Sequence, residues 1–565
     1  TDDDPDLDTW LLEIQQRPSP SISVVRSTGN YAANCNAAID ASANDLVALI
    51  KDETVAIQHN WLEELVRSCL QPDIVGAAPR LITPGGGLIQ NAGNVLGLKG
   101  IVGSPYDGKA KLGEPGYLDC LLVARDVSVL PAACMMIRKS AYLSVSGMDE
   151  LDLGNHLAEV DLCQKLRRNN WRLIFQPLAT VVYGGSAELM IAADTEQQAR
   201  RAQTESRATR AFRERWQPSA SVDPYWNPNL SLAEATPVLE TDFRSQWQYL
   251  PSDAPRILAR PLTNGQGTFR ITSPLRALRK AGLAAECSWP QRGQHEPMAS
   301  EVMRLAPDTL IVQHYLSDPK LELLESLHAI PGRPFIVFSI DDLLTNMAAS
   351  NPLRKYVPAN SRARLRYALE RCDRMVASTH FLAETYRHFI PDIRVVPNRL
   401  EQDIWLPLQS QKRTGKKPRI GWAGGTTHQD DLLLLKSVIE RTRDEADWIF
   451  FGMCPDEIRP LLSECHPFTE LSAYPGRLAA LNLDIAVAPL AQIPFNQGKS
   501  NLRLLEYGIL GIPVVCTDID PYHDSPACCV ANSTEAWVEA LRARIHDADA
   551  REHEGDAAEN RLDLS

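Results

Sequence analysis

Short apolar runs alternate with amphipathic stretches along the first 217 residues. The runs are rich in β-branched or aromatic residues, which is typical of strands, and the amphipathic stretches have helical spacing. In chain order these segments are residues 22–25, 32–41, 46–50, 61–69, 160–168, 173–175 and 180–183. The alternation of strand and helix predicts an α/β sheet in this part of the chain.

A change of pattern follows this first domain. Residues 196–216 are polar and rich in Arg and Gln, and we expect a helix there. Residues 218–252 are dense in Pro, Asn and Ser, which is typical of a linker or of a segment that wraps around a domain. The sequence therefore predicts a domain over 1–217 and a boundary over 218–252.

The strand–helix pattern restarts near residue 256 and again near residue 419. A charged stretch with Gly and Pro, residues 409–418, separates the two repeats. We expect two facing Rossmann-like subdomains, 253–415 and 416–565, with a ligand cleft between them.

Composition narrows the class of protein. The 565 residues predict three to four folded units, and the 44% hydrophobic and 23% charged residues indicate a globular chain. A net charge of -13 argues against a broad nucleic-acid surface, although it leaves a local basic pocket open. No apolar run approaches the roughly 18 residues of a membrane span.

The cysteines and the start of the chain bear on location. The 12 cysteines are scattered without a C-x-x-C pair, so reduced thiols in a cytoplasmic protein are the simplest expectation. The chain begins at Thr1, in an acidic turn without the features of a secretory signal. From this start we expect a fragment or a processed product.

Two acidic clusters are candidate sites in the first domain. Asp52 and Glu53 directly follow the apolar run 46–50, and we expect them at the carboxyl end of a parallel strand. Their oxygens suit Mg²⁺ or Mn²⁺ bridging a diphosphate, and an ordinary acidic turn is the alternative. Glu159, at the start of a helix with Asp161, could be a base for a sugar hydroxyl or only a helix-capping carboxylate.

A glycine-containing loop follows the first strand of the second half. Gly265 and Gly267 would let the backbone approach a ligand, and Arg270 would supply a fixed cation to a phosphate or leaving group. The spacing is not the dinucleotide fingerprint, because Arg270 stands where Gly or Ala is required. A plain strand–helix turn is the alternative.

Gly424 and Gly425 form a second such loop after the apolar run 419–423. A helix is expected to begin near Asp430, so the loop could hold a phosphate at a helix N-terminus. The alternative is that Thr426 or Thr427 only caps that helix.

A cluster of charged residues follows near the C-terminal end. Lys499, Arg503 and Glu506 have the spacing of one helix face, so two cations could neutralise a diphosphate while Glu506 accepts ribose hydroxyls. Ser500 follows Lys499 as in a P-loop, but Ile493 occupies the position of the first P-loop glycine. A solvated charged face with an internal salt bridge is the alternative.

The ordered motifs of residues 1–232 resemble a family 2 glycosyltransferase of the bacterial surface-polysaccharide type. They comprise Asn30-Tyr31-Ala32-Ala33, Asn36, Lys51-Asp52-Glu53, Trp61-Leu62, residues 134–138, Gly147-Met148-Asp149-Glu150, residues 159–163 and residues 223–230. The resemblance implies a GT-A fold, a nucleotide-sugar donor and a divalent metal. It places Asp52 and Glu53 on the metal-binding D-x-D motif, Glu159 on the base and Asp3 in the acidic turn that contacts the nucleotide.

This sequence departs from the family pattern at several positions. Lys51 replaces a usual Asp or Asn, Glu53 and Glu159 are each one methylene longer than the usual Asp, and Tyr183 stands where a metal-binding His is common. The opening strand–helix–strand of the fold is not present before Thr1. These departures leave both an active and an inactive first domain open.

Residues 253–545 resemble a family 4 glycosyltransferase of GT-B type. The motifs are the loops at Gly265 and Gly424, Asp341-Asp342-Leu343-Leu344, residues 372–378, Val396-Pro397-Asn398-Arg399 and residues 495–515. Glu506 matches the second acid of the family's E-x7-E motif, and Gly498 replaces the first. The resemblance implies a metal-independent, retaining transfer with Lys499 and Arg503 near the donor phosphates.

The sequence therefore predicts an α/β tandem: an incomplete GT-A Rossmann-like domain followed by a GT-B domain. The expected reaction moves a sugar from a nucleoside-diphosphate sugar to a cell-surface glycan or a lipid-linked glycan. The expected location is cytoplasmic, with attachment to the inner membrane face left open. Two alternatives remain, a nucleotide-sugar epimerase and a non-catalytic scaffold in the first half with only the second half active.

Overall fold

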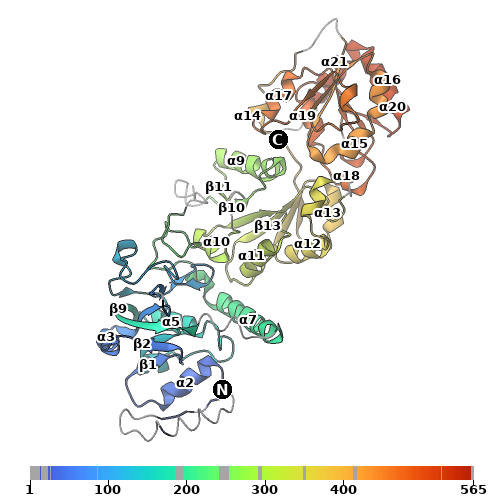
Figure 1. Ribbon diagram of the computed structural model, residues 1–565. Helices are drawn as coiled ribbons and strands as arrows, with labels where there is room; N and C mark the ends of the chain where they lie inside the picture. The colour runs from blue at the N-terminus through green and yellow to red at the C-terminus, as the bar shows by residue number, and fades with distance from the viewer. Residues whose placement is uncertain are drawn as a thin grey trace. The chain divides into compact units, whose positions relative to one another are not determined.

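The chain folds into two compact units in a computed structural model (Figure 1). The structure describes residues 13, 23–25, 27–85, 87–185, 195–240, 254–289, 296–347, 351–411, 417–523 and 525–560. The first unit combines Thr1–Thr241 with two later segments, Pro297–Leu305 and Ser326–Arg333. The second unit comprises Asp242–Glu296, Ala306–Glu325 and Pro334–Ser565.

The first unit is built on a mixed sheet. Its strands, in spatial order, are β1 (Leu46–Ile50), β8 (Cys134–Arg138), β3 (Ile74–Ile82), β9 (Arg172–Tyr183) and β2 (Thr54–Ala56), with β4 (Ile89–Asn91) and β7 (Arg125–Asp126) pairing at its sides. Only β3 and β9 pair in parallel among these described strands, and β1 runs antiparallel to β8. The prediction that Asp52 and Glu53 follow a parallel strand is therefore wrong. An apolar run indicates burial but does not distinguish the two directions of pairing.

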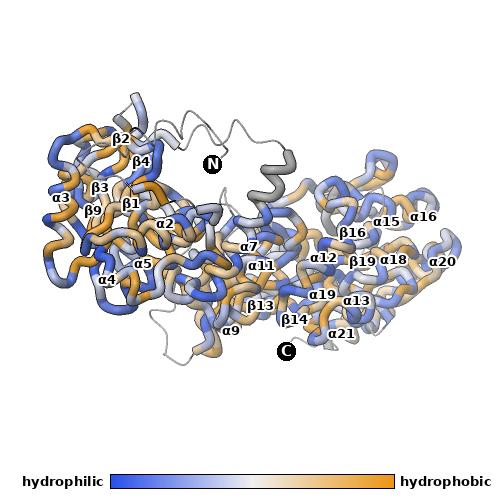
Figure 2. Tube along the Cα trace, turned by 90° about the horizontal axis from the view of Figure 1, so that it is seen from below, coloured by the Kyte–Doolittle hydropathy of each residue, from blue (hydrophilic) through white to orange (hydrophobic). Residues whose placement is uncertain are grey.

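Helices cover both faces of this sheet. They are α2 (Tyr31–Ala41), α3 (Trp61–Cys69), α4 (Lys139–Ser144), α5 (Ala158–Arg168) and α7 (Thr195–Ala220). Side chains of α2 and α5 share one core with Val75 of β3, and Leu65 of α3 packs in another with Ala77. All nine residues of β3 are buried because neighbouring β3 residues contribute to both cores. In Figure 2 the covering helices change repeatedly from hydrophilic to hydrophobic along their length, as expected for helices with one buried face.

Residues after α7 wrap onto the first unit. The Asp223 carboxylate accepts a hydrogen bond of 2.7 Å from the backbone N–H of Leu96. The Leu232 carbonyl accepts one of 2.7 Å from Lys99, which lies between the strands of a two-stranded ribbon, β5 (Val95–Leu96) and β6 (Val102–Gly103). Residues 221–240 are thus part of the first unit, which fits the wrapping alternative, and residues 241–252 lie outside the described residues.

The second unit contains two parallel sheets. The first has the order β11 (Ala285–Ser288), β10 (Arg256–Arg260), β12 (Thr309–Gln313), β13 (Phe335–Ile340), β14 (Arg374–Ala377) and β15 (Ile393–Val395). The second has the order β18 (Glu464–His466), β17 (Asp447–Gly452), β16 (Arg419–Gly424), β19 (Ile485–Ala488), β20 (Val514–Thr517) and β21 (Cys528–Val530). Every strand pair in both sheets is parallel in the described ranges. The predicted repeat of the strand–helix pattern is confirmed.

Strand β17 shows why the second sheet is covered on both sides. Trp448 and Phe450 point into one core with side chains of α16 (Lys436–Thr442) and α20 (Thr534–Ile545). Ile449 and Phe451 point into the other, with side chains of α17 (Tyr474–Ala480) and α19 (Leu502–Gly508). Alternation with a period of two buries the whole strand.

The strand orders place two switch points at the carboxyl ends of the strands. In the first sheet the chain leaves β10 on one side to form β11 and then crosses to β12 on the other. In the second sheet the order is that of the dinucleotide-binding fold, with the reversal between β16 and β19. Ligands of such sheets bind in the crevice at these points, so a ligand is expected at the loops after β10, β12, β16 and β19.

Two further observations concern the described residues of both units. Over the described residues, no helix combines the length and the apolarity that crossing a bilayer requires. All twelve cysteines are free thiols.

Candidate functional site

The turn after β16 is the centre of the candidate site. Gly424 ends the strand, and a single 3-10 turn (Thr426–His428) leads into α15 (Gln429–Leu433), close to the predicted start at Asp430. A Cβ atom on Gly424 would lie 2.4 Å from the Trp422 ring and 3.0 Å from Nη2 of Arg503. A Cβ atom on Gly425 would meet no atom within 4 Å. The Arg503 guanidinium therefore lies against the glycine turn, with open space beside Gly425.

Arg503 is held by a partly buried network. Its Nη1 donates hydrogen bonds of 2.7 Å to Oε2 of Glu506 and 2.7 Å to the Tyr474 hydroxyl. The Tyr474 hydroxyl donates to the same Glu506 oxygen at 2.9 Å. Burial raises the pKa of Glu506, and the Arg503 guanidinium opposes that rise. Only 3% of the Glu506 side chain is exposed, so the solvated-face alternative does not describe this pair.

Lys499 and Ser500 precede the helix instead of lying on it. Because α19 begins at Leu502, the interpretation of Lys499, Arg503 and Glu506 as one helix face is wrong for Lys499. The Lys499 ammonium lies 4.9 Å from the centre of the Phe495 ring. It nevertheless acts on the same site, since its charge lowers the pKa of His428.

Gly498 and Ser500 connect the two halves of the second unit. The Ser500 hydroxyl accepts a hydrogen bond of 2.8 Å from Nδ2 of Asn398, which follows β15. A Cβ atom on Gly498 would lie 3.1 Å from Cδ2 of Leu382 and 3.5 Å from Cβ of Leu343. An acid at position 498, as in the family motif, would therefore collide with the other half.

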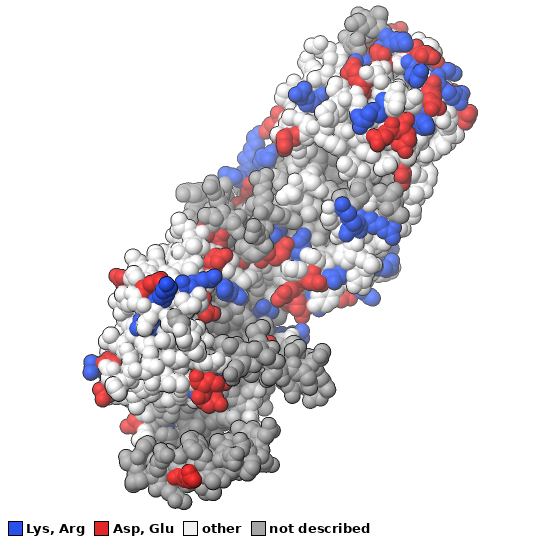
Figure 3. All heavy atoms as spheres, viewed as in Figure 1, with Lys and Arg blue, Asp and Glu red and all other residues white. Residues whose placement is uncertain are grey.

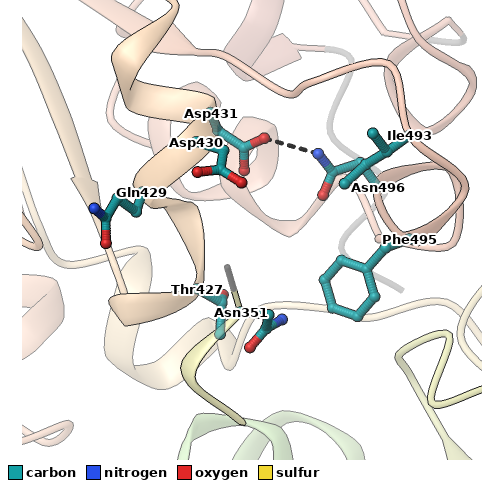
Figure 4. Close-up of a pocket in the computed structure, with 8 residues that line it drawn as sticks. All are labelled: Asn351, Thr427, Gln429, Asp430, Asp431, Ile493, Phe495 and Asn496. Atoms are coloured by element: carbon teal, nitrogen blue, oxygen red, sulfur yellow. Dashed lines mark hydrogen bonds between the residues drawn. The ribbon is translucent and has the colours of Figure 1, made fainter. Parts of the chain in front are cut away.

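A histidine–aspartate pair, with a half-buried His428 and a buried Asp431, follows the glycine turn. Nδ1 of His428 is 2.8 Å from Oδ2 of Asp431, and Oδ1 of Asp431 accepts 2.7 Å hydrogen bonds from Ala491 N and Asn496 Nδ2. Figure 4 shows the Asn496 amide hydrogen-bonded to the Asp431 carboxylate, and both residues line a cavity of about 20 Å³, large enough for one water.

The protonation of this pair follows from its surroundings. Burial and the charge of Lys499 lower the pKa of His428 to about 4. Burial acts to raise the pKa of Asp431, but the hydrogen bond and charge of His428 keep it below its usual value. A neutral imidazole beside a carboxylate must donate through Nδ1, which leaves Nε2 as an acceptor. Sequence reasoning missed this pair, although the H-x-x-D spacing places both residues on one side of a helical turn.

Two of the predicted site residues in the loop after β10, Gly267 and Arg270, have a mainly structural role. A Cβ atom on Gly267 would lie 1.8 Å from the Leu262 carbonyl oxygen, so only glycine fits there. Nη1 of Arg270 donates to the Val396 carbonyl at 2.5 Å and to Oδ1 of Asn398 at 2.9 Å. Arg270 therefore holds the loop that positions Ser500, and burial lowers its pKa. Gly265 has no such constraint, since a Cβ atom there would be 3.7 Å from its nearest neighbour.

A second acidic cluster, also missed as a site, follows β13. The Gln266 amide donates to Oδ2 of Asp342, and Nε2 of His314, after β12, lies 3.5 Å from Oδ1 of Asp341. Burial raises the pKa of Asp342 to about 6, and the nearby charge of Lys499 opposes the rise. The carboxyl ends of the first sheet and the Lys499 segment of the second thus meet at one site.

In the first unit, Asp52 and Glu53 lie in an exposed turn between β1 and β2. Their charges, together with burial, raise the pKa of Tyr183, which pairs with Thr54 across β2 and β9. Among the described residues no three His, Cys, Asp or Glu side chains gather as metal ligands. Two adjacent carboxylates beside Tyr183 do not by themselves fit a divalent metal. A divalent metal at this turn stays a prediction.

Glu159 lies in the first turn of α5, as predicted, and is half-buried. Burial raises its pKa, and the nearby charges of Lys51 and His156 oppose the rise. The Lys51 ammonium lies 5.2 Å from the centre of the Tyr31 ring, on α2. The neighbouring Asp161 is fully buried and binds α7 through Arg215 Nη1 and Trp216 Nε1, both at 2.8 Å. The predicted nucleotide contact Asp3 lies outside the described residues.

Comparison with known proteins gives partial matches, and no family model matches the chain. Over 206 residues it is 32% identical to the uncharacterized protein y4gI of Sinorhizobium fredii, covering 36% of this chain and 22% of that protein. It is 25% identical over 211 residues to the O-antigen biosynthesis protein RfbC of Myxococcus xanthus (36% and 15% covered). It is 30% identical over 159 residues to a pre-mycofactocin glycosyltransferase of Mycobacterium tuberculosis (28% and 31% covered).

These relatives are matched over a minor part of their length. The chain spans between 15% and 31% of the three curated relatives. Among solved structures, a sucrose-phosphate synthase from Thermosynechococcus elongatus is similar at a TM-score of 0.40 and 10% identity, over 54% of this chain and 94% of that one.

Proposed function

We propose that the second unit is a GT-B-type glycosyltransferase domain that uses a nucleoside-diphosphate sugar. The observation that carries the proposal is the contact of Arg503 with the Gly424 turn at the switch point of a dinucleotide-type sheet. Open space beside Gly425 and the charge of Lys499 complete a place for a diphosphate. The relative from Mycobacterium tuberculosis, matched over 28% of this chain, is named a glycosyltransferase, which supports that class of reaction for the chain as a whole.

In this proposal the side chains of the site have different roles in the reaction. Arg503 and Lys499 would stabilise the diphosphate that leaves when the sugar is transferred, since fixed cations in a dry site act most strongly on developing charge. The Glu506–Tyr474 network fixes the Arg503 guanidinium in place. His428 would offer Nε2 to a hydroxyl of the donor, because Asp431 holds its other nitrogen.

We further propose that the first unit is a GT-A-like domain and that the acceptor is a surface glycan. The ordered motifs of residues 1–232 support the first part, and the name of the relative from Myxococcus xanthus supports the second. Glu159, held in a half-buried position beside Lys51, would be the base of this unit if it is active.

The decisive experiment titrates a panel of nucleoside diphosphates, with and without Mn²⁺, and reads calorimetric heat. One nucleotide should bind without metal, and Glu506→Ala should weaken it while Glu535→Ala, an exposed residue of α20, should not. Turnover of the matching sugar nucleotide should release free nucleoside diphosphate, which an epimerase does not do. Absence of any metal-independent binding in a folded sample would overturn the proposal.

A non-catalytic first unit is the second candidate, favoured by Lys51 and Tyr183 at the expected metal site. The double substitution Asp52→Ala and Glu53→Ala decides between the two. Loss of a Mn²⁺-dependent nucleotide site and of glycan synthesis would support an active first unit. Unchanged synthesis would leave only the second unit as an enzyme.

A further inference from the structure

A second pocket in the second unit is lined by basic side chains. It has a volume of about 560 Å³ and lies at the start of α12 (Ser361–Leu369), where Arg362, Arg366 and His388 line it together with Phe389. The described residues that line it include no carboxylate. The size is that of a small-molecule site, so the pocket can hold more than an ion.

The sequence around this pocket is unusual for an acidic chain. Residues 351–369 carry four arginines and one lysine and no Asp or Glu, whereas the whole chain has a net charge of -13. Figure 3 shows Lys and Arg side chains gathered over the region of α12 and α13 (His380–Tyr386). A concentration of one sign of charge at a concave surface attracts the opposite charge.

The two lining arginines lie against the same aromatic ring of the pocket. Both guanidinium groups lie over the Phe389 ring, at 5.5 Å for Arg362 and 5.9 Å for Arg366. Arg366 also approaches Glu370 at 3.4 Å, on the exposed side of the helix. Arg364, between them, is instead used internally, because it donates to the Leu316 carbonyl at 3.0 Å and to Asp318 at 2.6 Å.

The backbone at the start of α12 adds to the positive character of the pocket. Asn360, the N-cap residue, makes no capping hydrogen bond with its side chain. Its amide oxygen instead accepts a hydrogen bond of 3.0 Å from Nε of Arg364. The first-turn N–H groups are thus left without a side-chain cap, and they are oriented to bind an anion.

The pocket is connected to the candidate site through Tyr386. The Tyr386 hydroxyl lies 3.2 Å from Oγ1 of Thr345, which also lines the pocket. Burial raises the pKa of this hydroxyl, and the Thr345 hydrogen bond opposes the rise. Thr345 follows Asp342 by three residues along the chain. The pocket therefore lies next to the acidic cluster that follows β13.

We propose that this pocket binds a phosphate or diphosphate group of the acceptor substrate, held by Arg362, Arg366 and His388. The inference rests on the proposed function of the second unit and names the chemical class of its acceptor, a phosphate ester of a glycan carrier. Bound in this way, the acceptor hydroxyl would be directed toward Asp342 and the donor site. Guanidinium pairs are suited to this role because they bind phosphate oxygens with two parallel hydrogen bonds.

The test uses the full chain and citronellyl diphosphate, a short soluble prenyl diphosphate, measured by calorimetry with the donor nucleotide present in excess. Arg362→Ala with Arg366→Ala should weaken its binding at least tenfold and leave the nucleotide affinity unchanged. Lys436→Ala with Arg443→Ala, which removes the same charge from exposed positions on and next to α16, should change neither. Equal binding by the wild type and the Arg362/Arg366 variant would overturn the proposal.

A second arm separates the acceptor phosphate from a lipid surface. Sedimentation with vesicles of phosphatidylcholine and phosphatidylglycerol (7:3) is compared with vesicles of phosphatidylcholine alone. If the two arginines support vesicle binding but not binding of the soluble diphosphate, the site is a membrane contact and the proposal is wrong. If the donor proposal fails, no nucleoside diphosphate binds to the protein. Citronellyl diphosphate can still be titrated against the wild type and the Arg362/Arg366 variant, so the two proposals can fail independently.

Discussion

Arg503 links two parts of the site that respond differently to substitution. Its Nη1 belongs to a partly buried network with Glu506 and Tyr474, and its Nη2 lies by the Gly424 turn. The network with Glu506 and Tyr474 stabilises the fold, whereas the position of Nη2 at the Gly424 turn serves the proposed ligand. Substitutions at this residue can therefore separate stability from binding, provided that the buried carboxylate is neutralised at the same time.

We expect Arg503→Met to lower the free energy of unfolding by about 3 kcal/mol, because it leaves the buried Glu506 without its cation. Adding Glu506→Gln should restore much of that stability but none of the nucleotide affinity. Urea unfolding and calorimetric titration measure the two effects. A double variant that binds nucleotide as well as the wild type would contradict a phosphate role for Arg503.

His428 makes stability depend on pH. Burial lowers its pKa to about 4 in the folded chain, against 6.5 for an exposed imidazole. The unfolded chain therefore binds a proton that the folded chain does not, so stability present above pH 6.5 is lost as the pH falls toward 4. The full effect is on the order of 3 kcal/mol.

His428→Asn tests this prediction directly. An Asn amide can still donate to Asp431 but does not titrate, so the variant should lose less stability than the wild type between pH 7 and pH 5. Urea denaturation at both pH values gives the comparison. Equal losses in the two proteins would show that other groups carry the pH dependence.

At the scale of elements, the repeating strand–helix pattern was predictable and its details were not. Each strand of the two parallel sheets is a short apolar run, and local sequence indicates burial of that kind well. The antiparallel partner of β1 depends on β8, more than 80 residues later, and no local pattern encodes that pairing. The start of α19 at Leu502 was missed because the spacing of Lys499, Arg503 and Glu506 fits a helix whether or not the backbone continues through 499.

The candidate site shows the same division. The glycine turns and the charged segment near Arg503 were recognised because their residue types carry the chemistry. The Asp342 and His428 clusters were not assigned, because they gain their properties from burial and from partners distant in sequence. Tyr474 belongs to the same class, since nothing in its own sequence context indicates contact with Arg503.

Gly424 and Gly425, at the end of β16, allow two matched alanine substitutions that test the role of the turn. Gly424→Ala should reduce both stability and nucleotide affinity, because its Cβ would collide with Trp422 and press on Arg503. Gly425→Ala should leave the melting temperature unchanged and still weaken nucleotide binding, because a ligand would fill the space beside it. Thermal melts with and without nucleotide distinguish the cases. If Gly425→Ala binds normally, the ligand does not approach this residue.

At the scale of the molecule, we expect the two units to unfold in two separate thermal transitions. Nucleotide should shift only the transition of the second unit. The first unit depends on Asp161, which is fully buried between α5 and α7 and is paired with Arg215 and Lys165. The proposed nucleotide site belongs entirely to the second unit. A calorimetric scan should therefore show one transition that responds to nucleotide and one that does not.

Asp161→Asn should lower only the transition that does not respond to nucleotide. Loss of a buried, paired carboxylate costs about 3 kcal/mol, which for a unit of this size corresponds to roughly 5 to 10 °C. Asp152→Asn is the matched control, because Asp152 is 45% exposed and reaches Arg215 only at 3.6 Å. A shift of both transitions by Asp161→Asn would mean that the units melt together.

The first unit is assembled from three stretches of chain, and this has a consequence for how the protein is made and how it can be divided. The hydroxyl of Ser300, on α10 (Ala299–Leu305), donates to the Gly97 carbonyl at 3.0 Å, and Arg304 donates to the Leu230 carbonyl at 2.8 Å. During synthesis the first unit therefore cannot reach its final packing until β10 and β11 of the second have left the ribosome. A gene cut after residue 241 would encode a first unit with an uncovered surface where α10 belongs, without the contacts of Ser300 and Arg304.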